Sequence, residues 1–196
     1  AGDHVDRVGE HDEAAGSRER PTAAKRGQGQ QRQQWRPGDR QELFDGLADP
    51  GLYRFIPQEP PADAAALRAR FERLAARRSP AGDQAWLNWA VRLPDGSHAG
   101  LVEATVGSTG AADITYFVFR RCQGRGIGRR AVGAVVEALA AEPAVTAIGA
   151  SVDTRNAASI ALVEALGFER AGLIRDADHF KGAASDEVRY QLPLGR

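Results

Sequence analysis

The chain has 196 residues, in which 26 lysines and arginines balance 26 aspartates and glutamates, so its formal net charge is zero. A balanced charge gives no electrostatic reason to expect nucleic acid or an anionic membrane as a partner. No apolar run approaches the roughly 20 residues of a membrane span, and the N-terminus lacks the apolar segment of a signal peptide. Cys122 is the one cysteine, which excludes an internal disulfide, and these features together predict a cytoplasmic protein.

The first 37 residues differ in composition from the rest of the chain. Their large apolar side chains are Val5, Val8 and Trp35, set among Gly, Gln, Arg, Asp and Glu. So few apolar groups cannot offset the conformational entropy lost on folding. Residues 1–37 are therefore predicted to be a disordered or poorly structured tail, and residues 38–196 to form one domain.

Helices are expected first after the tail, and strands follow them. A short helix is predicted over 40–48 and a longer amphipathic helix over 62–78. Residues 86–93 and 98–106 flank the turn sequence Pro-Asp-Gly-Ser and are expected to form a β-hairpin. The next strand, 114–119, is β-branched and aromatic (ITYFVF), as buried strands often are.

The second half of the chain alternates between helices and strands. Three antiparallel strands thus precede a helix, and the fold class is predicted to be mixed α/β with a mainly antiparallel central sheet. The remaining expected elements are a helix over 126–142, a strand over 145–153, a helix from Asn156 to Gly167, and closing strands near 168–174 and 187–192.

A glycine-rich segment, RRCQGRGIGRR at 120–130, directly follows the strand at 114–119. Gly124, Gly126 and Gly128 lack the Cβ atoms that would keep a ligand away from the backbone. The free N–H groups of the following helix and the positive end of its dipole favour an anion there, as do the arginines of the segment. This junction predicts a site for a pyrophosphate.

The spacing of the glycines distinguishes between nucleotide-binding loops. A P-loop needs Lys and then Ser or Thr after its last glycine, whereas Arg129 and Arg130 follow Gly128. The Rossmann offset Gly-x-Gly-x-x-Gly is also absent. The pattern that remains is Gln-x-x-Gly-x-Gly, formed by Gln123, Gly126 and Gly128.

That pattern resembles the pyrophosphate loop of the GNAT superfamily of acetyl-CoA-dependent N-acyltransferases. A second segment supports the resemblance, because Asn156, Ser159 and the terminal Gly167-Phe168 are similar to a helix of the same superfamily. The similarity is greatest to its branch of ribosomal-protein N-terminal acetyltransferases. Two motifs in the family's order are more specific than either motif alone.

The resemblance implies a single GNAT-like domain with acetyl-CoA as cosubstrate. Its fourth and fifth strands are expected to splay apart, between flanking helices, and to hold the pantetheine arm in the gap. An apolar first strand is also usual, so either 30–36 supplies it or the sheet starts one strand short. The residues assigned to the coenzyme are Tyr116, Phe117 and Val118 along the strand, Gln123, Gly124, Arg125, Gly126, Ile127, Gly128 and Arg129 in the loop, and Asn156 and Ser159 on the later helix.

The general acid and base are less clear from the resemblance. Many relatives carry a Tyr where this chain has Val163, and a carboxylate where it has Ser151. Ser159 is a candidate donor to the leaving sulfur. Glu103, Asp113 and Asp178 are carboxylates that could accept the proton, through water if needed, and Glu103 and Asp178 are the favoured two. The four histidines show no metal-ligand spacing, so no metal site is expected.

Two classes of function follow from the sequence. The first is an N-acetyltransferase that acts on a primary amine, either a protein N-terminus or a small molecule. The alternative is a non-catalytic acyl-CoA-binding module, which the missing Tyr and carboxylate keep open. The expected partner is the amine acceptor, with no nucleic acid and no membrane, and the protein is expected to be a monomer or a homodimer.

Overall fold

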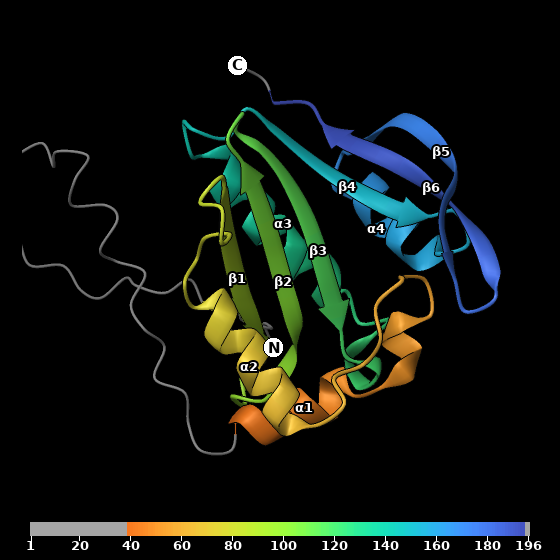
Figure 1. Ribbon diagram of the computed structural model, residues 1–196. Coiled ribbons are helices and arrows are strands. Elements are labelled where there is room, and N and C mark those ends of the chain that lie inside the picture. Colours follow the sequence, from red (N-terminus) through yellow and green to blue (C-terminus); the bar gives the residue numbers. More distant parts are fainter. Residues whose placement is uncertain (1–38, 195–196) are drawn as a thin grey trace, which may run out of the picture.

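The computed structural model describes residues 39–194, which form a six-stranded sheet with helices packed against it (Figure 1). The strand order is β1-β2-β3-β4-β6-β5. Short 3-10 helices, η2 (Pro50–Tyr53) and η3 (Arg120–Cys122), follow α1 and β3. The helices are α1 (Asp39–Leu47), α2 (Ala64–Leu74), α3 (Ile127–Ala140) and α4 (Ala157–Ala165), and the strands are β1 (Gln84–Arg92), β2 (His98–Gly107), β3 (Ala111–Val118), β4 (Ala147–Asp153), β5 (Glu169–Phe180) and β6 (Ala183–Leu192). The predicted mixed α/β domain is confirmed.

The predicted tail, 1–37, lies outside the described residues, and so does the segment 30–36 that was considered as a first strand. The strands expected to be the fourth and fifth of the domain are therefore β3 and β4 here. No helix in the part of the chain from 39 to 194 is long and apolar enough to cross a membrane.

Local signals decide where the N-terminal helices begin and end. The carboxylate of Asp63 caps α2 by accepting a hydrogen bond of 2.7 Å from a backbone N–H of its first turn. The helix ends at Leu74, before the predicted boundary at 78. It stops there because Arg77 takes a left-handed φ of 57° and Arg78 forms a β-bridge with Ala85.

The strands β3 and β4 are the parallel pair of the described sheet, and they separate after a short stretch of pairing. Residues 111–113 of β3 pair with 147–149 of β4, and the register stops there. The other neighbouring strands pair antiparallel. The splayed strand pair that the resemblance implies is thus present, and it leaves one edge of each strand without a strand partner (Figure 1).

Side-chain alternation along β3 divides the core into two layers. Ile114 packs with Val132 of α3 and Ile148 of β4 on one face of the sheet. Phe117 packs with Leu43 of α1 on the other face. Because neighbouring residues of a strand point to opposite faces, one strand serves both layers. We call these the α3–α4 face and the α1–α2 face.

The closing hairpin, β5 and β6, is longer than the sequence predicts. Strands were expected only near 168–174 and 187–192, whereas pairing continues to Phe180 and Ala183. The polar run between the predicted strands, RDADHFKGAASD, has the composition of a loop. It forms strands because pairing between β5 and β6 satisfies its backbone, with a register shift between Ile174 and Asp178 that absorbs the irregular residues.

A buried carboxylate joins this hairpin to β4. Asp153, the last residue of β4, is only 3% exposed and accepts a hydrogen bond of 2.6 Å from the Ser185 hydroxyl of β6. It also accepts hydrogen bonds from the backbone and side chain of Arg155. These bonds, those from Arg155 first, lower the pKa of Asp153 from 3.8 to about 2. The charged carboxylate therefore stabilises the attachment of the hairpin.

We expect Asp153→Asn to lower the free energy of unfolding by about 2 kcal/mol at pH 7, the equivalent of the lowered pKa. A carboxylate whose pKa is depressed in the folded state stabilises the fold above its unfolded pKa, and that stabilisation is lost as the pH falls from about 4 to about 2. Urea unfolding of both proteins across this range measures the difference. Asp45→Asn, an exposed change on α1, is the control. An equal loss at every pH would contradict the prediction.

Candidate active site

The glycine loop lies at the C-terminal end of β3, beyond the point where β3 and β4 separate. Gly124 and Gly126 have positive φ values of 71° and 73°, which favour glycine. The helix α3 begins at Ile127, and its first hydrogen bond runs from the Arg130 N–H to the carbonyl of Gly126 at 3.2 Å. The amides of 127–129 therefore have no acceptor within the helix and are suited to binding an anion.

The three glycines of the loop serve different purposes. A Cβ at Gly124 would have no atom within 4 Å, and one at Gly126 would approach only a flexible arginine side chain. A Cβ at Gly128 would lie 2.9 Å from Cγ2 of Val118. Gly124 and Gly126 thus leave backbone open on the surface, whereas Gly128 lets α3 pack closely against β3.

The side chains of the loop also divide into two groups. The Gln123 side chain donates a hydrogen bond of 2.9 Å to the carbonyl of Val118, which fastens the loop to the end of β3. Arg125 and Arg129 are exposed and free to turn toward an anion. Ile127 is buried in the core, so only its backbone is available to a ligand. The coenzyme roles predicted for these residues stay predictions.

The edge of β3 that faces β4 presents the backbone of Tyr116 and Val118. The Phe119 N–H donates to the carbonyl of Ala99 on β2 at 2.8 Å. Backbone N–H and C=O groups alternate between the two edges of a strand, so those of Phe117 also bond to β2. The backbone groups of Tyr116 and Val118 therefore point to the opposite edge, toward β4. Only these two of the three predicted pantetheine residues can offer backbone groups at the open edge.

The N-terminus of α4 lies beside the side chain of Tyr116. Asn156 is the N-cap of α4, and its side-chain oxygen accepts a hydrogen bond from the Ser159 N–H at 3.2 Å. The Tyr116 hydroxyl approaches the carbonyl of Ser159 at 3.5 Å. Burial raises the pKa of the Tyr116 hydroxyl, so it stays protonated. The structure thus joins Tyr116 and Ser159, while Val163 is fully buried in the core.

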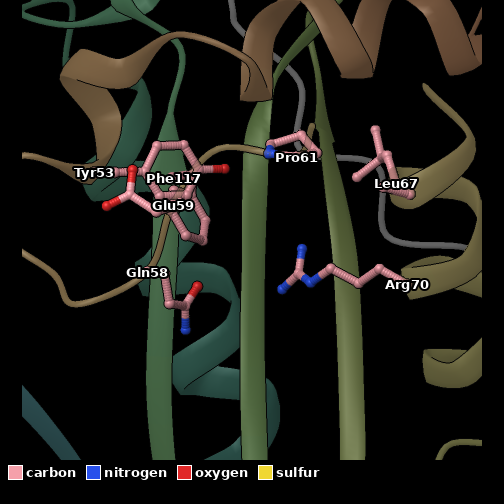
Figure 2. A pocket seen from close by; sticks show the side chains of 8 residues that line it. Tyr53, Gln58, Glu59, Pro61, Leu67, Arg70 and Phe117 are labelled. Carbon is pink, nitrogen blue, oxygen red and sulfur yellow. The ribbon is translucent and has the colours of Figure 1, made fainter. Parts of the chain in front are cut away.

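A cavity of about 130 Å³ opens on the α1–α2 face, beside Phe117 of β3 (Figure 2). The rings of Tyr53 and Phe117 lie 5.5 Å apart at its wall. Burial raises the pKa of the Tyr53 hydroxyl. The positive charge of Arg70 lowers this pKa, and the negative charge of Glu103 raises it. The lining residues are Tyr53, Gln58, Glu59, Pro61, Ala66, Leu67, Arg70 and Phe117. No sequence motif indicated this cavity, because its residues come from η2, the following loop, α2 and β3.

Glu103, one predicted proton acceptor, is held by an ion pair beside this cavity. Both of its carboxylate oxygens accept hydrogen bonds of 2.7 Å from the Arg70 guanidinium of α2. The two side chains are 17% and 31% exposed, so the pair is largely screened from water. The arrangement fixes α2 on β2 and occupies both carboxylate oxygens of Glu103.

The tip of the β5–β6 hairpin binds the loop that lines the cavity. The Lys181 ammonium donates to the carbonyls of Tyr53, Ile56 and Gln58, and it lies 3.8 Å from the Glu59 carboxylate. Three converging carbonyls suit a compact ammonium better than a planar guanidinium. Lys181 therefore links the C-terminal hairpin to the loop between α1 and α2, a contact that the sequence did not reveal.

Asp178, the other predicted proton acceptor, lies on β5 opposite Ser185 of β6. Because directly opposed residues share a face, Asp178 lies on the same face as Asp153. The three predicted catalytic residues are not brought together: Ser159 lies near the α3–α4 face, and strands β3, β4 and β6 separate Glu103 from Asp178 in the sheet. Among residues 39–194, no group of three or more His, Cys, Asp or Glu could hold a metal ion.

A splayed strand pair that ends in a glycine loop and a helix N-terminus is the arrangement that the resemblance to acetyl-CoA-dependent acyltransferases implies. The sequence model described as the acetyltransferase (GNAT) domain matches residues 33–169. The chain therefore belongs to the GNAT acetyltransferase family, as the two motifs predicted. No curated protein matches it.

Solved structures of acetyltransferases share the fold. Spermidine N-acetyltransferase from Vibrio cholerae, in complex with CoA and spermine, has a TM-score of 0.69 at 16% identity, over 82% of this chain and 92% of that one. Ribosomal-protein-alanine N-acetyltransferase from Brucella melitensis has a TM-score of 0.65 at 21% identity, over 80% and 95%. A putative acetyltransferase from T. thermophilus has a TM-score of 0.63 at 25% identity, over 79% and 80%.

We expect Lys181→Asn to loosen the loop at 53–59. Asn tolerates the left-handed φ of 51° at this position but has no ammonium to bind the three carbonyls. Hydrogen bonds from a partly exposed charged group contribute about 1 kcal/mol here, so amide exchange in 53–59 should accelerate about fivefold. Exchange measured by mass spectrometry tests this, with Arg175→Asn on the same hairpin as control. Unchanged exchange in 53–59 would show that the contact does not hold the loop.

Proposed function

We propose that this protein is an N-acetyltransferase that transfers the acetyl group of acetyl-CoA to a primary amine. The open edge of β3, which leads directly into the glycine loop, carries this proposal. An extended pantetheine chain can pair with the backbone of Tyr116 and Val118 as an added strand would. The pyrophosphate then reaches the amides of 127–129 at the N-terminus of α3.

The remaining coenzyme contacts follow from this placement. Gln123 holds the loop at the end of the strand, and Arg125 and Arg129 supply positive charge next to the pyrophosphate. Asn156 orders the first turn of α4 beside the strand edge. Ser159 and the Tyr116 hydroxyl lie next to each other there, where either can donate a hydrogen bond to the departing sulfur.

The acceptor amine is proposed to enter from the α1–α2 face. The cavity beside Phe117 lies on that face, directly behind the strand edge assigned to the coenzyme. Its polar lining residues include Gln58, Glu59 and Arg70, and they suit an acceptor with both a cationic and a polar part. The Lys181 contact holds one wall of the cavity in place.

The chemistry then needs no metal. The neutral amine attacks the thioester carbonyl, and the N–H of Val118 stabilises the developing oxyanion, an effect of about 3 to 4 kcal/mol for single donors in other enzymes. The C–S bond breaks, coenzyme A leaves, and the nitrogen loses a proton. Most of the acceleration comes from holding amine and thioester in contact.

Acetyl transfer is tested by incubating the protein with acetyl-CoA and a set of amines and following the release of free thiol. The amines should include spermidine, spermine, and peptides with N-terminal alanine, the acceptors suggested by the names of the similar structures. Amine-dependent thiol release with an acetylated product, seen by mass spectrometry, supports the proposal. Coenzyme binding without transfer to any amine would instead favour a non-catalytic acyl-CoA-binding module.

We expect Gly124→Val to weaken acetyl-CoA binding at least tenfold, because its side chain would occupy the open surface assigned to the pyrophosphate. The positive φ adds a stability cost of about 1 to 2 kcal/mol. Gly82→Val is the matched control: it has a φ of 77° and similar open space, and it lies in the turn before β1. Calorimetry should find full affinity in the control. Equal affinities in the two variants would refute the assignment of the loop.

Ser159→Ala should lower turnover by tenfold or less, since one neutral hydrogen bond contributes about 0.5 to 1.5 kcal/mol. Steady-state kinetics with the best amine measures the effect, and an unchanged KM for acetyl-CoA would separate chemistry from binding. Tyr116→Phe, which removes the neighbouring hydroxyl, shows whether the two donors substitute for each other. A thousandfold loss in Ser159→Ala would instead make the serine an essential acid.

A further inference from the structure

Glu187 lies on β6 at the level of the open strand edge. It is the register partner of Asp153 on β4. The parallel register that pairs 113 with 149 would, if extended, set Asp153 opposite Phe117, between Tyr116 and Val118. Glu187 is thus one strand away from the gap, at the height of the residues assigned to the pantetheine. Neighbouring strands lie about 4.8 Å apart, so the backbone of Glu187 lies about that far from β4, which forms one side of the gap.

The side chain of Glu187 shares the α1–α2 face with the acceptor cavity. Ile148, Ala150 and Val152 of β4 pack in the core on the α3–α4 face. Asp153, the register partner of Glu187, therefore points to the α1–α2 face, and Glu187 shares that face with it. Glu187 itself is half-buried, whereas most of β5 is exposed. A carboxylate in this position can reach an amine that approaches the gap from the α1–α2 face.

Hydrogen bonds fix the polar side chains next to Glu187. The Arg189 guanidinium donates to the hydroxyl of Ser151 on β4 and lies 3.3 Å from Asp113 Oδ1 on β3. The Ser151 hydroxyl lowers the pKa of Glu187, and it lies on the same face of the sheet. This chain of contacts runs from β6 across β4 to β3, at the base of the splayed pair, and it holds Ser151 diagonally across from Glu187.

The charges around Glu187 favour a carboxyl group that accepts a proton. Burial raises the pKa of Glu187, and the negative charge of Asp178 on β5 raises it further. Arg189 on the same strand and the bond from Ser151 oppose this, and Asp153 on β4 adds a smaller increase. A base whose pKa is raised toward the working pH transfers protons more effectively.

We propose that Glu187 is the general base of acetyl transfer, an inference that rests on the proposed function. After the neutral amine attacks the thioester carbon, the nitrogen of the adduct carries a positive charge and a readily lost proton. Glu187 takes this proton through one water while the C–S bond breaks. The proton then passes through solvent to the coenzyme A thiolate, so amine and acetyl-CoA yield the amide and the free thiol.

The two carboxylates predicted from the sequence are less suited to this role. Glu103 already accepts two hydrogen bonds from Arg70. Asp178 lies on β5, one strand farther from the gap than β6. Its negative charge acts on Glu187 instead, so Asp178 is a positioning residue that tunes the base.

The test is Glu187→Gln, assayed with the best amine found in the acceptor screen. We expect kcat to fall about a hundredfold, with the KM for acetyl-CoA and the melting temperature unchanged. The acidic limb of the kcat profile, which reports the ionisation of the base, should disappear. Glu169→Gln is the matched control, since it makes the same change at an exposed position of the same hairpin, opposite Gln191 at the far end. It should retain full activity.

Asp178→Asn supplies the second readout. Loss of the neighbouring negative charge should shift the acidic limb to lower pH and leave the plateau of kcat nearly unchanged. A hundredfold loss of kcat in Asp178→Asn would make Asp178 the base and overturn the inference. Full activity with an unchanged pH profile in Glu187→Gln would also overturn it while the proposed function stands. Absence of acetyl transfer by the wild-type protein to every amine overturns both.

Discussion

The short parallel pairing between β3 and β4 is the constraint on which the rest of the structure depends. It fixes the two strands together at 111–113 and 147–149 and then releases them, so that β3 keeps an edge with unpaired backbone groups. Such an edge is ordinarily a liability in a folded protein. Here it ends in the glycine loop and the N-terminus of α3, which makes it a continuous binding surface for an extended, anionic ligand.

Separated strands need other contacts to keep their positions, and polar groups supply them. Asp153 attaches the C-terminal hairpin to the end of β4 through Ser185 and Arg155. Lys181 attaches the tip of the same hairpin to the loop that lines the cavity. The hairpin thus joins the two sides of the sheet, and one wall of the proposed acceptor site depends on its position.

The sequence predicted the order and type of the elements because their signals are local. The glycine loop, the Asn156 cap and the hairpin turn before β2 each depend on a few neighbouring residues, and each is present where it was expected. Strand limits in β5 and β6 were wrong because their polar residues become strands only by pairing with each other. The motif at 120–130 likewise indicated the family, which the match over 33–169 shows.

The sequence by itself determined the family, the mixed α/β fold and the place of the glycine loop, since these depend on residues close together in the chain. The tertiary structure decided how the carboxylates differ. Glu103 is bound by Arg70 from 33 residues away, whereas the pKa of Glu187 is raised by Asp178 and lowered by Ser151, which lie on two other strands. The burial and charge that set the reactivity of a carboxylate come from such distant neighbours, and only folding brings them together.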